Sequence, residues 1–548
     1  MNSPTGVDAP RAIRPSGGMT RRRGLQLTAL ASVSAALSPR HAWAGRAAIS
    51  REYHLCLNPQ AVLGDPDFLG LVARAGVSCV WLDGFFYGHW PWSIETLTRA
   101  REALRQAGLE TRIVNVPLGH PGDSLGARDG DFPLTPPTHW RLGSNREGKP
   151  YAGTSLHAPA TQENVEAVHR LRRAGFSQFF LDDDFRLARA PGEIGGCFCV
   201  EHRDRFLRRA GLSDSRWPEL LDDVRSRRLT LLLRQWVEFT CDDLTAAFRA
   251  QQKAAGGKLG IMVMYLGAEK AGIRLADYRD VPFRVGEFMF NDQVFGPVKG
   301  KTDELSSVLF HRRFVAPESA WSETTAFPAD RLSAANMAAK LAISTIADVR
   351  HTTFMSGVTP FPKTHWATLG PEIRRQADFH RQLAGHRPRG PFKHYWGEAS
   401  RYTGDDRPFS LFLAAGVPFE VTDRPARDGW TFLSDADAAA AAEGKLVSRG
   451  TRFASRSTAP AGAGALEPCE ESLPALFTLK RRIRPALAKV PFVENDEPAV
   501  LAWYPSAQAA LLWNVRSEPA TFIVHCGTQR REIRLSGLES ALLSDLHL

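Results

Sequence analysis

The chain has 548 residues, which is more than one domain of ordinary size contains, so we expect two or three folded units. Its composition, with 43% hydrophobic and 23% charged residues, is that of a globular protein and excludes a disordered, collagen-like or polytopic membrane chain. Half of the formal net charge of +10 comes from six Arg and one Asp within residues 1–44, and no later basic stretch is interleaved with aromatic residues, so nucleic-acid binding is not indicated.

Residues 1–44 have the pattern of an export signal. Three consecutive arginines at 21–23 precede a mild apolar run at residues 28–37, and the sequence Ala-Trp-Ala at 42–44 follows as a cleavage site. The paired arginines resemble a twin-arginine signal, which predicts a periplasmic or secreted protein. The apolar run is shorter than the roughly 20 residues that span a bilayer, so a membrane anchor is the weaker interpretation and we expect no membrane insertion.

The next part of the chain alternates short apolar runs with helical patterns, as a parallel α/β fold does. The helical patterns include residues 94–107 and 161–174, each followed by a glycine. This order predicts a (β/α)8 TIM barrel over residues 45–388. An open doubly wound sheet is the alternative, but no Gly-x-Gly-x-x-Gly follows the first strand. The eight predicted strands are residues 53–58, 77–86, 111–118, 177–184, 259–266, 285–291, 319–323 and 351–355.

Two smaller units follow the predicted barrel. Residues 389–485 hold short apolar runs at 409–413, 418–421 and 431–433 together with an alanine-rich helix. This pattern predicts a small α/β domain of the flavodoxin or amidotransferase type. Residues 486–548 alternate apolar and polar residues at short intervals, which predicts a small antiparallel β domain at the C-terminus.

Two of the predicted strands end in carboxylates. Asp182, Asp183 and Asp184 end the fourth strand, with Arg186 close behind, and Glu323 ends the seventh strand. In a TIM barrel both ends open at the same mouth, where the chemistry takes place. Crowded like charges raise at least one carboxyl pKa, which suits a general acid, while a second carboxylate attacks or activates water. Such a pair predicts glycoside hydrolysis, and the alternative is that the Asp triplet binds a cation or caps a loop.

Further residues near the strand ends are suited to binding a sugar. Aromatic rings stack on the apolar faces of sugars, while carboxylates, amides and imidazoles bind the hydroxyl groups. Each of these residues, taken singly, is more often structural. The predicted substrate contacts are Asp182, Arg186, Asp83, Trp81, Tyr87, His120, Asn291, Asp292 and Trp366, with His54 and His157 as further candidates.

The chain resembles the β-galactosidases of glycoside hydrolase family 42, in the large clan of retaining (β/α)8-barrel glycosidases. The apolar segment 75–81 leads into the aromatic segment 84–91, as the first strands of that family do. The family has an Asn-Glu pair at the fourth strand, where this chain has Asp183 and Asp184. The resemblance therefore implies that Asp184 is the acid/base and Glu323 the nucleophile, and that the two smaller domains match those of the family.

Two departures limit what the resemblance implies. Asp184 is shorter than glutamate by about one methylene, which leaves room for a water molecule, so retaining and inverting mechanisms both stay open. Asp183 replaces the asparagine whose amide usually binds the 2-hydroxyl of the sugar. Specificity for β-galactosides therefore does not transfer, and the sugar, the anomer and the linkage stay open.

A cysteine-containing segment follows the fourth strand, where the family has Cys-x-Cys-x-x-Cys. Here Cys197, Cys199 and His202 have the spacing of three zinc ligands, but the local sequence does not supply the fourth ligand of a tetrahedral site. We therefore favour small, buried cysteines, with a structural zinc ion as the alternative. The seven cysteines are too few, and odd in number, for a disulfide framework. No organic cofactor is implied.

Together these patterns predict an exported glycoside hydrolase whose partner is a carbohydrate substrate. An alternative of another class is a non-catalytic carbohydrate-binding protein that kept the barrel and its aromatic cleft. A third, weaker interpretation is a metal-dependent hydrolase with Asp182, Asp183 and a nearby His as ligands. The family resemblance also implies a homo-oligomer, either a trimer or a dimer.

Overall fold

The computed structural model describes residues 51–546 except 119–127, 130–131, 134, 155, 183–184, 189–191, 264–265, 267–268, 285–289 and 457–465. Residues Ile49–Leu548 form one compact unit. The predicted export signal at residues 1–44 lies outside the described residues. Among the helices of the described stretches, none has the length and apolar character needed to cross a bilayer.

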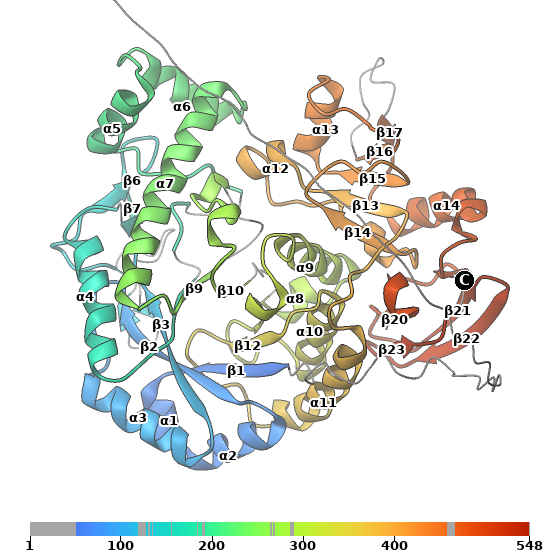
Figure 1. The fold of residues 1–548 in the computed structure, drawn as a ribbon, viewed down its shortest axis with the longest axis horizontal. Coiled ribbons are helices and arrows are strands. Elements are labelled where there is room, and N and C mark those ends of the chain that lie inside the picture. Colours follow the sequence, from blue (N-terminus) through green and yellow to red (C-terminus); the bar gives the residue numbers. More distant parts are fainter. Residues whose placement is uncertain are drawn as a thin grey trace, which may run out of the picture. The chain divides into compact units, whose positions relative to one another are not determined.

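Eight parallel strands close into a barrel, in which each strand pairs with its neighbours in chain order and the last pairs with the first (Figure 1). This confirms the predicted TIM barrel. The strands are β1 (Glu52–Leu57), β2 (Cys79–Phe86), β3 (Glu110–Val116), β8 (Phe179–Leu181), β9 (Leu259–Met262), β10 (Phe283–Arg284), β11 (Ala320–Thr325) and β12 (His351–Met355).

The described part of the sixth strand begins before the predicted start. The apolar pattern indicated residues 285–291, whereas β10 is Phe283–Arg284, and its register is fixed by pairs with β9 and β11. Phe283 and Arg284 were missed because a short apolar run alone does not fix where a strand begins. Residues 285–289 lie outside the described residues.

Helices surround the barrel and connect its strands (Figure 1). Many begin at a residue whose side chain accepts a hydrogen bond from the first turn, as Ser93, Thr230 and Ser333 do. The helices of this part are α1 (Pro59–Gly64), α2 (Pro66–Ala75), α3 (Ile94–Gln106), α4 (Ala160–Arg173), α5 (Val200–Ala210), α6 (Arg216–Ser226), α7 (Leu231–Ala254), α8 (Asp292–Phe295), α9 (Val298–His311), α10 (Ala334–Ile346) and α11 (His365–Leu383).

A second, parallel sheet of five strands follows the barrel, in the order β14-β13-β15-β16-β17. Numbered along the chain this is 2-1-3-4-5, the strand order of flavodoxin-like folds, which confirms the predicted small α/β domain. One predicted strand, residues 409–413, is instead a 3-10 turn at Leu411–Ala414, because a short buried apolar run does not distinguish the two. Its elements are β13 (Phe392–Tyr395), β14 (Phe419–Thr422), β15 (Trp430–Leu433), β16 (Arg452–Ser455), β17 (Leu466–Pro468), α12 (Glu398–Tyr402), α13 (Asp435–Ala442) and α14 (Leu473–Ile483).

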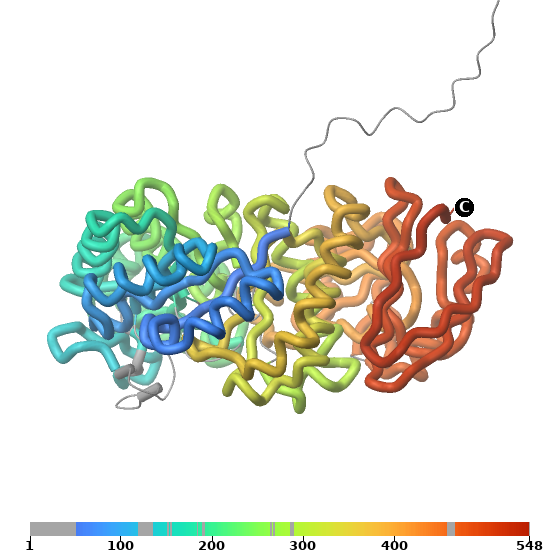
Figure 2. The backbone as a smooth tube through the Cα atoms, turned by 90° about the horizontal axis from the view of Figure 1, so that it is seen from below, coloured from blue at the N-terminus to red at the C-terminus, as the bar shows by residue number. Residues whose placement is uncertain are grey.

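The C-terminal strands form two antiparallel sheets, β18-β21-β22 and β19-β20-β23, which confirms the predicted β domain. They lie beside α11 (Figures 1 and 2). The Gln376 amide of α11 donates a hydrogen bond to Ser540 Oγ at 2.8 Å. The predicted domain limits after residues 388 and 485 stay predictions. The strands are β18 (Phe492–Val493), β19 (Ala499–Tyr504), β20 (Ala509–Asn514), β21 (Ala520–Cys526), β22 (Gln529–Leu535) and β23 (Ser540–Leu543).

Three aromatic side chains fill the middle of the barrel. The ring centroids of Trp81, Phe180 and Trp321 are 4.8, 5.0 and 5.5 Å apart, and we call these three residues the aromatic plug. Gly260 on β9 makes room for it, since a Cβ atom there would lie 2.3 Å from the Phe180 ring. The plug therefore separates the carboxyl end of the barrel interior from the amino end.

Shortening a ring of the plug is expected to destabilise the barrel. Phe180→Ala removes a side chain that is 1% exposed and leaves a cavity, so the free energy of unfolding should fall by about 3–5 kcal/mol in chemical denaturation. The control Phe327→Ala removes a ring that is 52% exposed and should change it by less than about 0.5 kcal/mol. Equal effects of the two substitutions would contradict the assignment of Phe180 to the core.

Candidate active site and metal centre

Charged side chains lie directly above the aromatic plug, at the carboxyl end of the barrel. Side chains alternate between the two faces of a strand, so residues two positions beyond each plug ring also point inward. These residues are Asp83, Asp182 and Glu323, which are 0%, 6% and 3% exposed. Three carboxyl groups are thus buried on the inward face at the end of the barrel where TIM-barrel enzymes carry out their chemistry.

Glu323 forms a buried ion pair with Arg284. Arg284 is the last residue of β10 and is 1% exposed, while Glu323 lies on the adjacent strand β11. Removing two charges from water is costly unless each compensates the other, and this contact provides that compensation. The pair therefore stabilises Glu323 as a carboxylate in a site that excludes most water.

Asp83 is held differently, by an indole instead of a cation. Trp92 Nε1 donates a hydrogen bond to Asp83 Oδ2 at 2.6 Å. Burial raises the pKa of Asp83 to about 7, although the Trp92 hydrogen bond opposes this effect. Asp83 therefore exchanges a proton near neutral pH. The sequence pattern gave Asp83 only as a candidate sugar contact and did not indicate this property.

The end of the fourth strand is described in part. The Asp182 N–H donates to the Asn115 carbonyl at 2.9 Å, which continues the pairing with β3 beyond Leu181. Arg186 is buried, and its Nε donates to the Ala188 carbonyl at 3.2 Å. Asp183 and Asp184 lie outside the described residues, so their roles as acid/base candidates stay predictions.

The other predicted sugar contacts are distributed over the barrel. Trp81 belongs to the plug, and Trp366, which is 2% exposed, packs against Phe68 and Phe354. Asn291 and Asp292 accept hydrogen bonds at the starts of α8 and α10. We therefore leave these four residues out of the proposed substrate site.

Two further predicted contacts differ in what the structure describes of them. Tyr87 directly follows β2 with a positive φ of 49° and is buried against Phe86. His120 lies outside the described residues. A contact of either residue with substrate stays a prediction.

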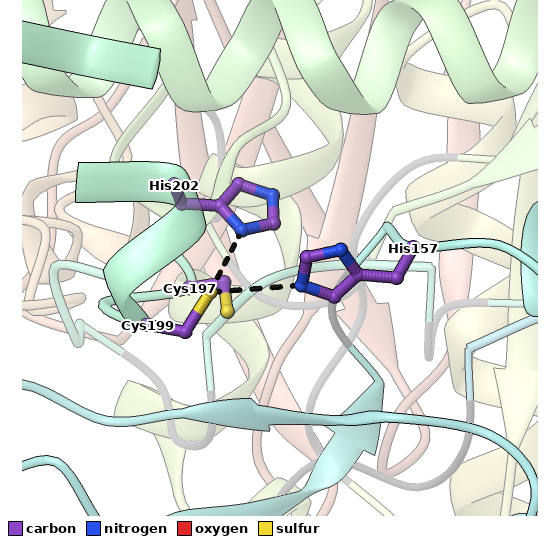
Figure 3. Close-up of side chains that lie close together, drawn as sticks. All are labelled: His157, Cys197, Cys199 and His202. Carbon is purple, nitrogen blue, oxygen red and sulfur yellow. Dashed lines mark hydrogen bonds between the residues drawn. The ribbon is translucent and has the colours of Figure 1, made fainter. Parts of the chain in front are cut away.

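A second cluster lies in the loop that follows the fourth strand. Cys197, Cys199 and His202 come together with a fourth residue, His157, and their ligand atoms all lie within 4.8 Å of one another (Figure 3). Cys199 Sγ is 3.2 Å from His202 Nδ1 and 3.6 Å from His157 Nε2. Two sulfur and two nitrogen donors, all buried, are the donor set of a tetrahedral zinc site.

A carboxylate lies near each imidazole of this cluster. His157 Nδ1 is 3.2 Å from Glu201 Oε2, and His202 Nε2 is 3.7 Å from Asp243 Oδ2, so the other nitrogen of each ring faces the sulfur atoms. Metal-binding histidines usually have such carboxylate partners. Burial lowers the pKa of His202 to about 4, so its imidazole is neutral at pH 7 and has a lone pair to offer.

The fourth residue of the cluster was absent from the sequence prediction because it is distant along the chain. His157 precedes α4 and was a candidate for binding a sugar hydroxyl, whereas the other three residues of the cluster lie at the start of α5. Only the fold brings the two segments together. The signal available in the sequence was a single histidine upstream of the Cys-x-Cys-x-x-His segment.

No protein-family model and no curated protein matches the sequence. Solved structures match the fold. A cold-adapted β-galactosidase from Rahnella sp. R3 aligns with 90% of this chain and 98% of its own, at 11% identity and a TM-score of 0.57. A catalytic mutant of Gan42B, a GH42 β-galactosidase from G. stearothermophilus, aligns with 90% of this chain and 99% of its own, at 10% identity and a TM-score of 0.55. The chain therefore has the fold of the GH42 β-galactosidases, as its resemblance to that family predicted.

The raised pKa of Asp83 is expected to make stability depend on pH. In the unfolded chain Asp ionises near pH 4, so between about pH 4 and pH 7 the folded state binds more protons and stability falls as pH rises. Asp83→Asn removes this dependence. The melting temperature of the variant should therefore fall less than that of the parent between pH 5 and about pH 7.

The exposed residue Glu102 provides the control, because Glu102→Gln should leave the pH profile of the parent unchanged in this interval. A parent and an Asp83→Asn variant with parallel profiles would show that Asp83 is ionised throughout and would contradict its assignment.

Proposed function

We propose that the chain is an exported glycoside hydrolase that cleaves the O-glycosidic bond of an oligosaccharide or glycoside. The observation that carries the proposal is the buried ion pair of Glu323 with Arg284 at the carboxyl end of the barrel. A carboxylate held dry and ionised at this position suits attack on an anomeric carbon. The fold of the GH42 β-galactosidases adds support, and a carbohydrate substrate follows from the same argument.

In the proposed mechanism an aspartic acid of the fourth strand and Glu323 act on opposite sides of the scissile bond. The aspartic acid, for which Asp184 is our first and Asp183 our second choice, gives its proton to the leaving oxygen as the bond to the anomeric carbon breaks. Glu323 either bonds to that carbon, to be displaced later by water, or accepts a proton from an attacking water. Arg284 balances the charge of Glu323 before the reaction.

The second candidate function is a carbohydrate-binding protein without turnover. The observation that favours it is the pair Asp183-Asp184 in place of the Asn-Glu pair of the family. Loss of the amide donor and a shorter acid would weaken catalysis while the barrel mouth still holds a sugar. This candidate predicts binding of the same sugars by the parent and by Glu323→Gln.

We also propose that His157, Cys197, Cys199 and His202 hold a structural zinc ion. The donor set, its burial and the two carboxylate partners support this assignment. When bound, zinc supplies a closed tetrahedral centre and no catalytic position. The four residues would join the start of α4 to the start of α5 and so fix the loop that follows the predicted acid/base.

Export and assembly complete the proposal. The arginine run and cleavage pattern within residues 1–44 support a periplasmic or secreted location by a twin-arginine route, which suits a protein that binds a metal ion before export. The family resemblance supports a homo-oligomer. Sedimentation of the mature chain measures its mass in solution directly.

Hydrolysis of a panel of aryl α- and β-glycosides tests the proposed function. We expect the parent to cleave at least one of them, and Glu323→Gln and Asp184→Asn each to lower kcat/KM by about a hundredfold or more, because each loses a group that acts in the transition state. Glu102→Gln, on the exposed face of α3, should keep the activity of the parent. A parent that cleaves nothing but melts at a higher temperature with a sugar would contradict the hydrolase and support the binding protein.

Removal of one thiol tests the zinc centre. Cys199→Ser should contain one zinc equivalent fewer than the parent, measured by elemental analysis of the purified chain, and should melt at a lower temperature because metal binding contributes to folding stability. Cys469→Ser, at a half-buried cysteine of the second domain, is the control and should keep the metal. Equal zinc content in the Cys199→Ser variant and the parent would contradict the assignment.

A further inference from the structure

Three potential metal ligands converge at the amino end of the barrel, on the opposite side of the aromatic plug from the candidate active site. Glu52 on β1 and His351 on β12 are register partners where the first and last strands pair. His54 lies two residues after Glu52 and so on the same face of β1. One ligand atom from each of the three lies within 4.8 Å of the others.

The distances among these atoms fit a shared cation. Glu52 Oε2 is 3.6 Å from His54 Nε2 and 3.4 Å from His351 Nδ1. Ligands about 2.0–2.2 Å from a tetrahedral ion are separated from one another by roughly 3.3–3.6 Å. Both distances from Glu52 therefore match such a site, and the ligand atoms of the two imidazoles lie within 4.8 Å of each other.

The hydrogen bond of His351 determines which of its nitrogens faces this site. His351 Nε2 is 3.1 Å from the Glu318 carbonyl oxygen, and because a carbonyl only accepts, Nε2 carries the hydrogen and donates. In the neutral ring Nδ1 then presents a lone pair toward the Glu52 carboxylate. Metal-binding histidines have this arrangement, with one nitrogen donating to a carbonyl and the other free to bind.

His54 is suited to bind a cation because its ring nitrogens are buried and have no hydrogen-bond partner among the described residues. The whole residue is 0% exposed. Buried polar atoms without a partner are costly, and a cation would satisfy Nε2. The Trp321 ring, 4.3 Å from the His54 ring and stacked on the His351 ring at 4.2 Å, fixes both imidazoles in place.

The surrounding charge leaves room for a cation. Arg112 is the nearby positive group, and its Nη2 is 3.8 Å from Glu52 Oε2 but 3.1 Å from Glu110 Oε2, so a second carboxylate balances its charge. The side chain of Glu52 is 41% exposed, which gives an ion a path from solvent.

We propose that Glu52, His54 and His351 bind a divalent transition-metal ion such as Zn²⁺, with water as the remaining ligand. Two imidazole nitrogens and one carboxylate oxygen are a donor set that zinc favours. The ion links β1 to β12 at the seam where the barrel closes, and it stabilises the closed barrel. This site is independent of the proposed glycoside hydrolysis, because the aromatic plug lies between them.

Zinc stoichiometry of the mature chain tests the proposal. Metal-free protein is titrated with Zn²⁺ in competition with a chromophoric chelator. We expect the parent to bind two equivalents, one at the cluster that contains Cys197 and one at the Glu52, His54 and His351 site, which we call the floor site. Glu52→Gln and His351→Gln should each bind one equivalent, since each removes one ligand of the floor site. His169→Gln, at an exposed histidine of α4, is the matched control and should bind two.

A second measurement covers variants that fold poorly. Zinc added after one equivalent is bound should raise the melting temperature of the parent and of His169→Gln, but not that of Glu52→Gln. Glu52→Gln is used because the Glu52 side chain is partly exposed, so the substitution should leave the fold intact. Zinc binding by the parent that neither Glu52→Gln nor His351→Gln lowers would overturn the proposal, whether the parent binds one equivalent or two.

Discussion

The buried ion pair of Arg284 with Glu323 is the interaction on which the proposed chemistry depends. Two charges that are 1% and 3% exposed are tolerable only as a pair, and both come from adjacent strands whose register fixes them. The barrel must therefore close correctly for the pair to form. In return, the pair keeps a carboxylate ionised in a site from which water is largely excluded, which is the condition for a nucleophile or base at that position.

The aromatic plug gives the barrel two separate polar ends. Trp81, Phe180 and Trp321 fill its middle, and the alternation of side chains places carboxyl groups above them and the Glu52, His54 and His351 cluster below. Asp83 and Glu323 lie on the same side of the plug but in different surroundings, an indole hydrogen bond for one and a guanidinium for the other. Their environments separate a carboxyl group that titrates near neutral pH from one that is charge-paired.

Much of the fold could be predicted from the sequence, because buried parallel strands appear as apolar runs separated by helical periodicity. The carboxylate of Glu323 was found in the same way, at the end of such a run. Contacts between distant segments could not be found: His157 joins the cysteine cluster only through the fold. His54 was taken for a sugar contact, although it lies near the start of β1 and so at the amino end of the barrel. The partner of Glu323 was missed because Arg284 lies just before the start that the apolar pattern gave for this strand.

A double-mutant cycle on Arg284 and Glu323, with kcat/KM for the best glycoside as the readout, tests most directly whether their ion pair prepares the carboxylate for catalysis. If Arg284 acts through Glu323, the double variant Arg284→Met, Glu323→Gln should lose no more activity than Glu323→Gln alone, since the group it serves is already absent. Losses that multiply in the double variant would show that the two residues act independently. That result would contradict the claim that their ion pair prepares the carboxylate for catalysis.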